Sequence, residues 1–389
     1  YFFGIRNTSF GSEDFGEVIE NHEVGTLFRH ARNGFYAQVY NFDHKGLYAK
    51  DNRLMKWGIR FQHQDIDDVV DEWQLFDSAG YALPHTPDVI GGYPDVLPEI
   101  AMDFVHKSHN LLSVNNVDGF VQNSWTIPYK DIGEFVITGG LRANYWGYNN
   151  KVHISPRVGI AYKPENEKNE TVYRLSGGVY SQTPFYREIR NRDGSLFKDA
   201  KAQQSYQIVA GNDFKFRAFN RPFILTSEAY FKYFTHVIPY DIDNVRIRYY
   251  ADQSARAYAT GLDFKVNGEF VKGIDSWASL SIMQTKEDIR GDYCLVDAEG
   301  NRLPFYNHSD SQVADTIALG WHYRPSNQLV NFSLFFQDYI PNAPTWRVNM
   351  TLTFGMGLPI SDNNSDFYST SSRYPAYRRV DIGFSKQLI

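Results

Sequence analysis

The strongest constraint on the fold of this chain is a strict alternation of apolar and polar residues, which is clearest at 346–358. Its even positions are all apolar: Trp346, Val348, Met350, Leu352, Phe354, Met356 and Leu358. The residues between them are polar or glycine: Arg347, Asn349, Thr351, Thr353, Gly355 and Gly357. Successive side chains of a β-strand point to opposite faces of its sheet. The segment therefore predicts a strand with one apolar and one polar face.

The same pattern recurs along the chain and predicts thirteen strands. Their approximate cores are 35–48, 54–66, 112–127, 135–146, 155–162, 172–181, 205–216, 223–237, 257–270, 277–285, 329–339, 346–358 and 378–389. We expect a fourteenth strand at 2–10. No segment with a helical period is of comparable strength.

Composition separates the classes of protein that such strands could build. Hydrophobic residues make up 42% of the 389 residues and the mean hydropathy is −0.45, which alone would suit a soluble protein. No stretch approaches the roughly 18 apolar residues of a membrane helix. A transmembrane barrel shares these values, because half of each strand faces water. Aromatic residues reach 16%, which is typical of the girdles of such barrels. The sequence therefore predicts an all-β fold, a transmembrane antiparallel β-barrel.

The connections between the predicted strands alternate in length. Short ones fall at 49–52, 128–133, 163–169, 218–222, 271–275 and 341–345. Long ones fall at 67–110, 182–204, 239–256, 286–328 and 359–377, and 147–153 is a short exception among them. Short turns at one end and long loops at the other are typical of bacterial outer-membrane barrels. A soluble β-sandwich shows no such bias.

The direction of the strands gives an expectation about the ends of the chain. The chain starts at Tyr1 without a signal-peptide pattern, and it ends at Ile389 within an alternating segment. The first and last of the thirteen strands both run toward the short turns. A barrel with both termini in the periplasm would then need at least two strands after Ile389 and more before Tyr1. We therefore expect residues 1–389 to be one part of a longer barrel.

Several segments resemble the barrel domain of TonB-dependent outer-membrane receptors, specifically those of Bacteroidetes. They are VDGFVQNSWTI at 117–127, GGLR at 139–142, SPRVGIAY at 155–162, GVYSQTP at 178–184, EAYFKYFTHVIPYD at 228–241 and ATGLD at 259–263. Each is weakly specific alone, but their order and spacing carry the resemblance over most of residues 31–389. The resemblance implies a barrel of 22 strands, of which the thirteen seen would be numbers 8 to 20. It also implies a plug domain and a TonB box, which these residues do not contain.

The resemblance implies a transport function without bond chemistry. A substrate too large or too scarce for porins would bind at the extracellular loops, and TonB would remodel the plug to let it pass. The substrate class stays open between a glycan, an oligopeptide and a metal chelate. Partners would be outer-membrane lipid or lipopolysaccharide, TonB and, as in some relatives, a surface lipoprotein lid. The alternatives are a barrel without energised transport, as in a porin or a scaffold subunit, and a soluble secreted β-protein.

Candidate chemistry outside transport is weak. The acidic run Asp65, Asp67, Asp68, Asp71 and Glu72 lacks the glycine-punctuated spacing of a calcium loop, so we expect a solvated strand rim rather than a metal site. His106 and His109 have no convincingly spaced partner ligand. No nucleophile elbow or phosphate-binding glycine loop occurs. We therefore expect neither enzymatic activity nor a cofactor. The net charge of −6 gives no reason to expect nucleic-acid binding, and Cys294 as a single cysteine excludes an intrachain disulfide.

The predicted loops are rich in aromatic residues, which suit recognition of sugars, peptides or chelates by stacking and hydrogen bonding. The alternative is packing of loop on loop, or an outer aromatic girdle. The ligand-binding candidates are Trp73, Tyr81, Tyr93, Phe185, Tyr186, Arg187, Tyr249, Tyr250 and Tyr293.

Charged residues on the polar faces of the strands form a second group of candidates. Because a charge on a lipid-facing surface is costly, they are expected to face the lumen and to pair with a plug rather than bind ligand directly. They are Arg60, Arg142, Arg157, Glu228, Lys232, Asp263, Lys265 and Arg379.

Overall fold

The computed structural model describes residues 2–6, 18–23, 27–77, 100–130, 132–165, 170–243, 246–303, 313–362 and 369–387. Contacts divide the chain into two compact units. Unit 1 comprises Tyr1–Val39, Gln64–Ser113 and Arg192–Leu196; unit 2 comprises Tyr40–His63, Val114–Asn191 and Phe197–Ile389. In the described part, the one helical element is the 3-10 turn η1 (Tyr186–Glu188), and no helix there has the length and apolarity to span a membrane.

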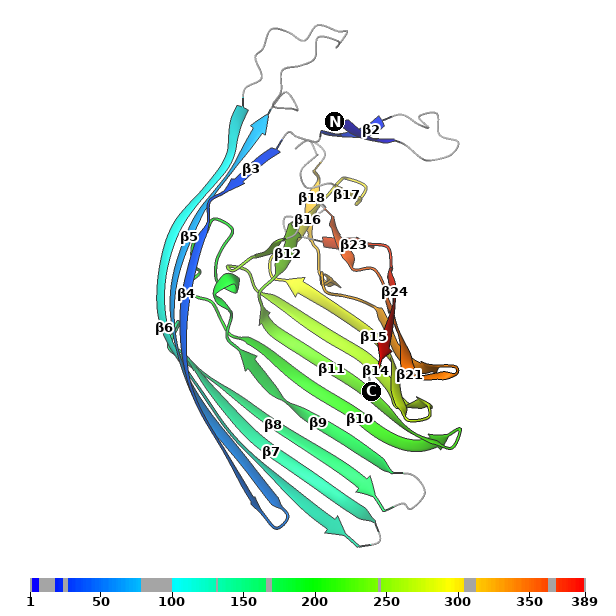
Figure 1. Cartoon of the computed structure of the whole chain (residues 1–389). Coiled ribbons are helices and arrows are strands. Elements are labelled where there is room, and N and C mark those ends of the chain that lie inside the picture. The colour runs from blue at the N-terminus through cyan, green and yellow to red at the C-terminus, as the bar shows by residue number, and fades with distance from the viewer. Residues whose placement is uncertain are drawn as a thin grey trace. The chain divides into compact units, whose positions relative to one another are not determined.

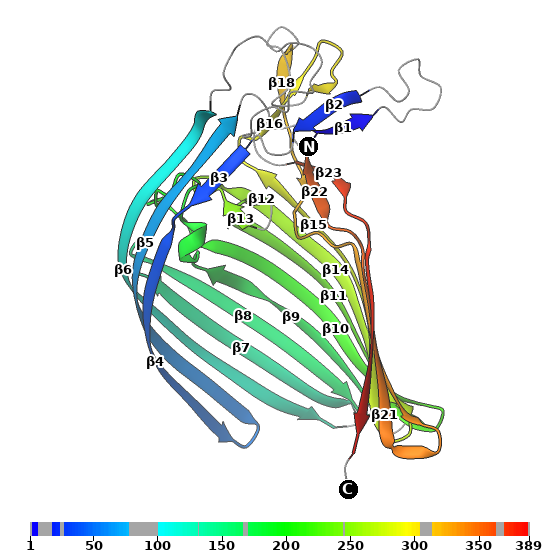
Figure 2. The same cartoon turned by 45° about the horizontal axis from the view of Figure 1, so that its top comes forward.

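Fifteen of the described strands form one large antiparallel sheet. Its pairing order is β24-β21-β20-β15-β14-β11-β10-β9-β8-β7-β6-β5, and β5 also pairs with β3 and β4. The bounds are β3 (Leu27–Ala31), β4 (Gly34–Lys50), β5 (Arg53–Asp77), β6 (Ile100–Tyr129), β7 (Gly133–Trp146), β8 (Lys151–Pro164), β9 (Thr171–Gln182), β10 (Gln203–Ala218), β11 (Arg221–Val237), β14 (Ala255–Val271), β15 (Ile274–Ile289), β20 (Val330–Ile340), β21 (Ala343–Gly355) and β24 (Tyr377–Lys386). Figure 1 shows β7 to β11 side by side, and Figure 2 shows the same order in a turned view.

Shorter strands lie in the connections. Four small sheets pair β1 (Phe2–Arg6) with β2 (Val18–Glu23), β12 (Tyr240–Asp243) with β13 (Arg246–Tyr249), β16 (Tyr293–Val296) with β17 (Arg302–Leu303) and β18 (Asp315–Ala318), and β22 (Pro359–Asp362) with β23 (Ser369–Arg373). In addition β19 (His322–Tyr323) pairs with Lys286 and Glu287, near the C-terminal end of β15.

All thirteen predicted strands are confirmed, since each falls on a strand of the large sheet. The expected fourteenth strand is present as β1 (Phe2–Arg6), but it pairs with β2 in a separate sheet and not with the large one. The predicted short turns at 49–52, 218–222, 271–275 and 341–345 are confirmed as well, whereas those at 128–133 and 163–169 include residues outside the described ones. One of the two-residue hairpins joins β10 and β11, where Phe219 and Asn220 both have positive φ, 55° and 58°. Two such residues match the right-handed twist of the flanking strands.

The predicted long loop at 67–110 was wrong at both ends. β5 continues to Asp77, so it extends through the acidic run, and β6 begins at Ile100. In unit 1, one face of β5 is buried, with Asp68 at 1% exposure and Glu72 at 8%. Asn33 donates a hydrogen bond to the Glu72 carboxylate at 2.5 Å. Because buried polar groups are tolerated when they are hydrogen-bonded, acidic residues here occupy a covered strand face, and their charge hid the strand from sequence analysis.

Cross-strand registers show that unit 2 has one continuous apolar face. Ile160 on β8 lies opposite Leu175, and the row continues through Ala210 and Ala229 to Leu262 and Ile282. The larger side chains of this row are 42–49% exposed, which is unusual for a water-facing sheet.

The opposite face of the same strands is polar. Arg174 on β9 begins a row that runs through Gly211, Glu228 and Asp263 to Ser281. Since cross-strand partners share a face, the period of two in each strand adds up to a two-sided wall.

We predict that substitution by arginine destabilises the protein much more on the apolar face than on the polar face. Leu262→Arg places a charge on the apolar face and should destabilise the folded protein by about 2–4 kcal/mol. Ser281→Arg lies across from Asp263 on the polar face and should cost less than about 0.5 kcal/mol. Urea unfolding of the full-length protein in detergent micelles measures both. Equal destabilisation by the two variants would contradict the assignment of faces.

Candidate functional site

The polar face of unit 2 carries the predicted charged residues. The registers place Arg157, Lys232, Glu228, Asp263 and Lys265 on one face of β8, β11 and β14. The same face reaches Arg142 through β7 and Arg379 through β24, because Arg142 pairs with Ser155 and Arg379 with Thr353. Arg60 joins them in a recess of about 180 Å³ that is also lined by Asp118 and Arg142. The sequence pattern was thus sufficient to group these eight residues.

Many of these charges are neutralised inside the wall itself. Arg60 lies 2.7 Å from Asp43, Arg142 lies 2.8 Å from Asp118, and Arg379 lies 2.8 Å from Asp381. Arg174 bridges two carboxylates, since it contacts Asp213 and lies 3.0 Å from Glu228. The partners lie on neighbouring strands, two positions apart on one strand or, for Arg174 and Glu228, on the two strands that flank β10. These ion pairs keep the long charged side chains against the polar face of the sheet, so the paired charges do not extend away from it.

A second group of cations rests on aromatic rings. Arg157 lies 5.1 Å from the ring centre of Tyr180, Lys232 lies 4.9 Å from that of Tyr230, and Lys265 lies 5.4 Å from that of Trp277. Within the described residues, none of the three has a carboxylate within 4.0 Å, and the same holds for Asp263 and a cationic partner. A cation held over a ring keeps most of its charge available to an approaching anion. Among the eight predicted residues, these four charged groups are therefore the best placed to contact a ligand or another protein domain.

Sequence analysis missed the wall partners Asp43, Asp118, Arg174, Asp213 and Asp381. All five occupy positions of their strands that share the polar face, so period-two counting would have put them there. Their pairing required the register between strands, which the sequence does not provide.

At the end of the sheet with the long connections, two loops bring several aromatic candidates together. The β9–β10 connection contains η1, in which the Glu188 carboxylate accepts hydrogen bonds from the Phe185 backbone N–H at 2.8 Å and from Gln203 at 3.3 Å. Partial burial raises the pKa of Glu188 above its ordinary value, although both hydrogen bonds lower it. The turn presents Phe185, which is 66% exposed, and the exposed Arg187, with Tyr186 half-buried between them.

Tyr249 on β13 lies within electrostatic reach of this turn. Burial raises the pKa of the Tyr249 hydroxyl, the negative charge of Glu188 raises it further, and the positive charge of Arg187 lowers it. The rings of Tyr249 and Tyr240 are 6.0 Å apart, so the hairpin presents two aromatic faces. The arrangement combines stacking surfaces with one anion and one cation, which suits a polar ligand with planar or ring-shaped groups.

The hairpin that carries Tyr249 is anchored by a small apolar cluster. Val237, Ala255, Ala257 and Ile289 are each at most 2% exposed, and Tyr250 packs against them. Tyr250 therefore has a packing role, while Tyr249 lies within electrostatic reach of the η1 turn. Nearby, the Arg324 guanidinium lies 3.2 Å from the fully buried Glu287 carboxylate and 6.0 Å from the ring of Tyr240. The loop surface formed by Phe185, Arg187, Tyr240 and Tyr249 is thus supported by packed and ion-paired residues beneath it.

The tip of the β9–β10 connection, Arg192–Leu196, belongs to unit 1. Its Gly194 has a φ of +88° and its carbonyl accepts a hydrogen bond from Asn110 at 2.7 Å. A Cβ at Gly194 would lie 2.2 Å from Ser108 Oγ, so only glycine fits this contact. Asp193 closes the turn by accepting hydrogen bonds from the N–H and hydroxyl of Ser195 at 2.9 and 2.7 Å.

The other aromatic candidates lie elsewhere. Trp73 is not in a loop: it lies in β5, stacked on His30 at 5.3 Å with Arg32 above its ring. Tyr293 is in β16 of the small three-stranded sheet. Tyr81 and Tyr93 lie outside the described residues. The structure therefore groups Phe185, Tyr186, Arg187 and Tyr249, with Tyr250 beneath them, and separates the rest.

No grouping in the described ranges suits a resident metal: no three His, Cys, Asp or Glu side chains converge there. Within the acidic run, the Asp67 carboxylate accepts a hydrogen bond from His109 Nε2 at 2.9 Å, and the Asp71 carboxylate lies 3.7 Å from the Lys107 ammonium. These carboxylates therefore pair along the neighbouring strand β6. The expected solvated rim was partly wrong, because Asp68 and Glu72 are buried.

Comparison with known proteins identifies the fold. No protein-family model and no curated protein matches the sequence. Among solved structures, the copper transporter OprC matches with a TM-score of 0.53 and 11% identity, covering 92% of this chain and 50% of that one. The outer membrane transporter YddB from Escherichia coli matches with a TM-score of 0.50 and 12% identity, covering 91% and 48%.

The chain thus spans about half the length of these two structures. At such low identity the likeness shows the fold, and it confirms the predicted fold class: the chain has the transmembrane antiparallel β-barrel fold of outer-membrane transporters. In this fold the apolar face of the wall contacts lipid and the polar face lines the lumen.

We predict that removal of Arg174, which bridges two carboxylates of the wall, lowers the free energy of unfolding by a measurable amount. Arg174→Met leaves Asp213 and Glu228 facing each other, and because all three are partly exposed we expect a loss of about 1 kcal/mol in the free energy of unfolding. The same substitution in an Asp213→Asn, Glu228→Gln background should cost less than half as much. Denaturant unfolding of the four proteins forms the cycle. Equal costs in both backgrounds would show that Arg174 acts without these carboxylates.

Gly194→Ala should release the loop tip. Positive φ and the clash with Ser108 act together, so we expect faster proteolytic cleavage within residues 183–202. Gly300→Ala is the matched control, because Gly300 has a φ of +82° but nothing within 4 Å of its Cβ position. Similar cleavage of the 183–202 segment in both variants would argue against a docked tip.

Proposed function

We propose that residues 1–389 form part of the barrel of a TonB-dependent outer-membrane receptor of the type found in Bacteroidetes. The observation that carries this proposal is the two-sided wall: one continuous apolar face, and an opposite polar face that carries Arg157, Lys232, Lys265 and Asp263. The fold shared with two outer-membrane transporters and the sequence resemblance over residues 31–389 support it. A location in the outer membrane follows from the same fold.

The proposed transport has two steps. A ligand first binds the loop surface formed by Phe185, Arg187 and Tyr249, above the lumen. A plug domain elsewhere in the protein then moves under the action of TonB, and the ligand passes along the polar wall. Arg157, Lys232, Lys265 and Asp263 are proposed to contact that plug, because the other four of the eight predicted wall charges are already paired within the sheet. No bond in the substrate is made or broken.

The ligand class follows from the chemistry of the loop surface. Tyr240 and Tyr249 offer ring faces, Arg187 a fixed positive charge and Glu188 a carboxylate. This set suits a large polar ligand such as a glycan, an oligopeptide or a metal chelate. A surface lipoprotein lid, as in some relatives of the resembled family, would close over the same loops.

Energised import is tested by uptake in the producing bacterium. Cells with and without the gene are given labelled pools of oligosaccharides, oligopeptides and ferric chelates. We expect one pool to accumulate only with the gene, and accumulation but not surface binding to stop when an uncoupler collapses the proton-motive force. Uptake that continues with the uncoupler would contradict the proposal and favour an open pore. Binding without uptake in any condition would favour a scaffold role.

The loop surface is tested by substitution. Arg187→Ala with Tyr249→Ala removes the cation and one stacking face, and we expect surface binding of the active pool to weaken about tenfold. Phe219→Ala is the control, since Phe219 is 86% exposed in a turn at the other end of the sheet. Unchanged binding in the double variant would place the ligand elsewhere.

A further inference from the structure

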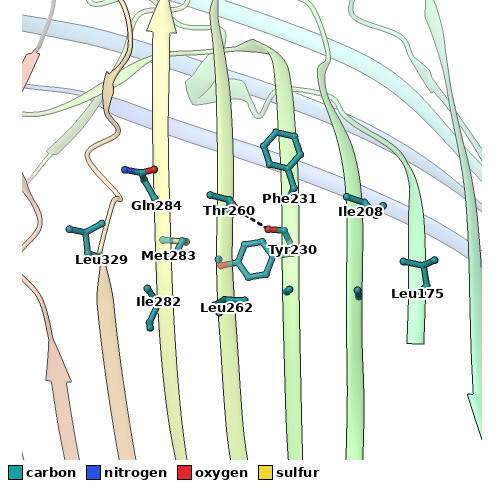
Figure 3. A pocket seen from close by; sticks show the side chains of 13 residues that line it. Leu175, Ile208, Tyr230, Phe231, Thr260, Leu262, Ile282, Met283, Gln284 and Leu329 are labelled. Atoms are coloured by element: carbon teal, nitrogen blue, oxygen red, sulfur yellow. Dashed lines mark hydrogen bonds between the residues drawn. The ribbon is translucent and has the colours of Figure 1, made fainter. Parts of the chain in front are cut away.

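The apolar face of unit 2 is not smooth: it contains a hollow between β9, β10, β11, β14 and β15. Its floor is made of Ala210 and Ala229, which lie opposite each other in the register. Its walls are the larger side chains of Leu175, Ile208, Phe231, Leu262, Ile282 and Leu329. Figure 3 shows these larger side chains around the hollow. The hollow measures about 530 Å³, and polar atoms make up little of its lining.

A hollow of this kind in a membrane needs an apolar occupant. Ile208 is 54% exposed, and Leu262 and Ile282 are 44% and 45% exposed, so the walls stand clear of the sheet. Water gains no hydrogen bonds there, and a void forfeits dispersion contacts with its lining. The hollow continues the lipid-facing surface without interruption. An acyl chain of the surrounding lipid is therefore the occupant that matches both its shape and its position.

Along the same strands, toward the long connections, the outward face becomes polar in two-residue steps. Thr260 pairs with Gln284 and then Tyr258 pairs with Lys286. Lys286 lies four residues beyond Ile282, which corresponds to about 13 Å along a strand. That distance separates the upper acyl region of a lipid from its headgroup. The outward face thus changes from apolar to cationic where a lipid changes from chain to headgroup.

The cationic end is built like a membrane interface. The Lys286 ammonium lies 4.9 Å from the ring centre of Tyr323, and Tyr258 and Trp321 form a second aromatic pair at 5.2 Å. Aromatic rings of this kind mark the headgroup level of barrels. Within the described part of the chain, Lys286 has no carboxylate within 4.0 Å, whereas its neighbour Arg256 is bound to Asp288. Arg373 lies 4.8 Å from the centre of the same Tyr323 ring and donates hydrogen bonds to the carbonyls of Asn327 and Gly357. Lys286 is therefore a cation at this end of the face that is available to an anionic headgroup.

We propose that the outward face of β10, β11, β14 and β15 binds one phosphorylated glycolipid of the outer leaflet, as in lipopolysaccharide. One acyl chain fills the hollow above Ala210 and Ala229, and a phosphate contacts Lys286. The inference rests on the proposed outer-membrane location, because that location puts the long connections, and hence Lys286, in the outer leaflet. It adds a specific lipid site that the transport function does not require.

The test is native mass spectrometry of the full-length protein in detergent with added bis-phosphorylated lipid A. We expect one lipid per barrel above the non-specific background. Lys286→Gln should weaken its binding about fivefold, since one cation at a membrane surface contributes about 1 kcal/mol. Ala229→Phe fills the hollow and should weaken binding to a similar extent. The matched controls are Lys272→Gln in the β14–β15 turn and Val158→Phe on the lipid face of β8, and both should bind as the unchanged protein does.

Lipid A without phosphates separates the two halves of the site. It should bind the unchanged protein and Lys286→Gln equally, but Ala229→Phe more weakly. If Ala229→Phe does not fold, the comparison of Lys286→Gln with both lipids still decides the headgroup assignment. Equal binding of lipid A to all variants would overturn the proposal. So would a dimer of barrels lost in Ala229→Phe, since a second copy would then occupy the hollow. Extraction of the protein without detergent would instead overturn the proposed outer-membrane function.

Discussion

The register between neighbouring strands is the constraint on which the rest of this structure depends. A slip by one residue would move every apolar side chain of a strand to the opposite face. In unit 2 the register stays continuous from β8 to β15, so Leu262 and Asp263, adjacent in sequence, belong to two different environments. Lipid contact, the charged lumen wall and the position of the loops all follow from that alignment.

Most of the wall was predictable from sequence, because its information is local. Thirteen strands and the shared face of residues such as Arg157 and Lys232 follow from a period of two. The sequence-based prediction failed where polar residues that are typical of loops lie inside a strand. The acidic residues of 65–72 indicated a loop, yet Asp68 and Glu72 lie buried in β5, where partners such as Asn33 satisfy them. Trp73 was placed in a loop by the same error.

The candidate site was only partly predictable for a different reason. Phe185, Arg187 and Tyr249 were recognised individually as loop residues, but their proximity depends on how two connections fold back over the sheet. Likewise the pairing of Arg174 with Asp213 and Glu228 depends on cross-strand register. Pairing inside the wall leaves only a few charges, among them Lys232 and Asp263, to face another body. Function in this fold therefore resides in long-range contacts that residue patterns along one strand do not encode.

Cysteine scanning along β14 in intact outer membranes would test the two-sided wall most directly. Single cysteines would be placed at 258–267 in a Cys294→Ser background and treated with a small, membrane-impermeant thiol reagent. The account predicts a period of two: cysteines at Asp263 and Lys265 react from the aqueous lumen, and those at Leu262 and Phe264 are shielded by lipid. Uniform reactivity, or reaction at the even positions, would contradict a lipid-facing apolar side and with it the barrel wall described here.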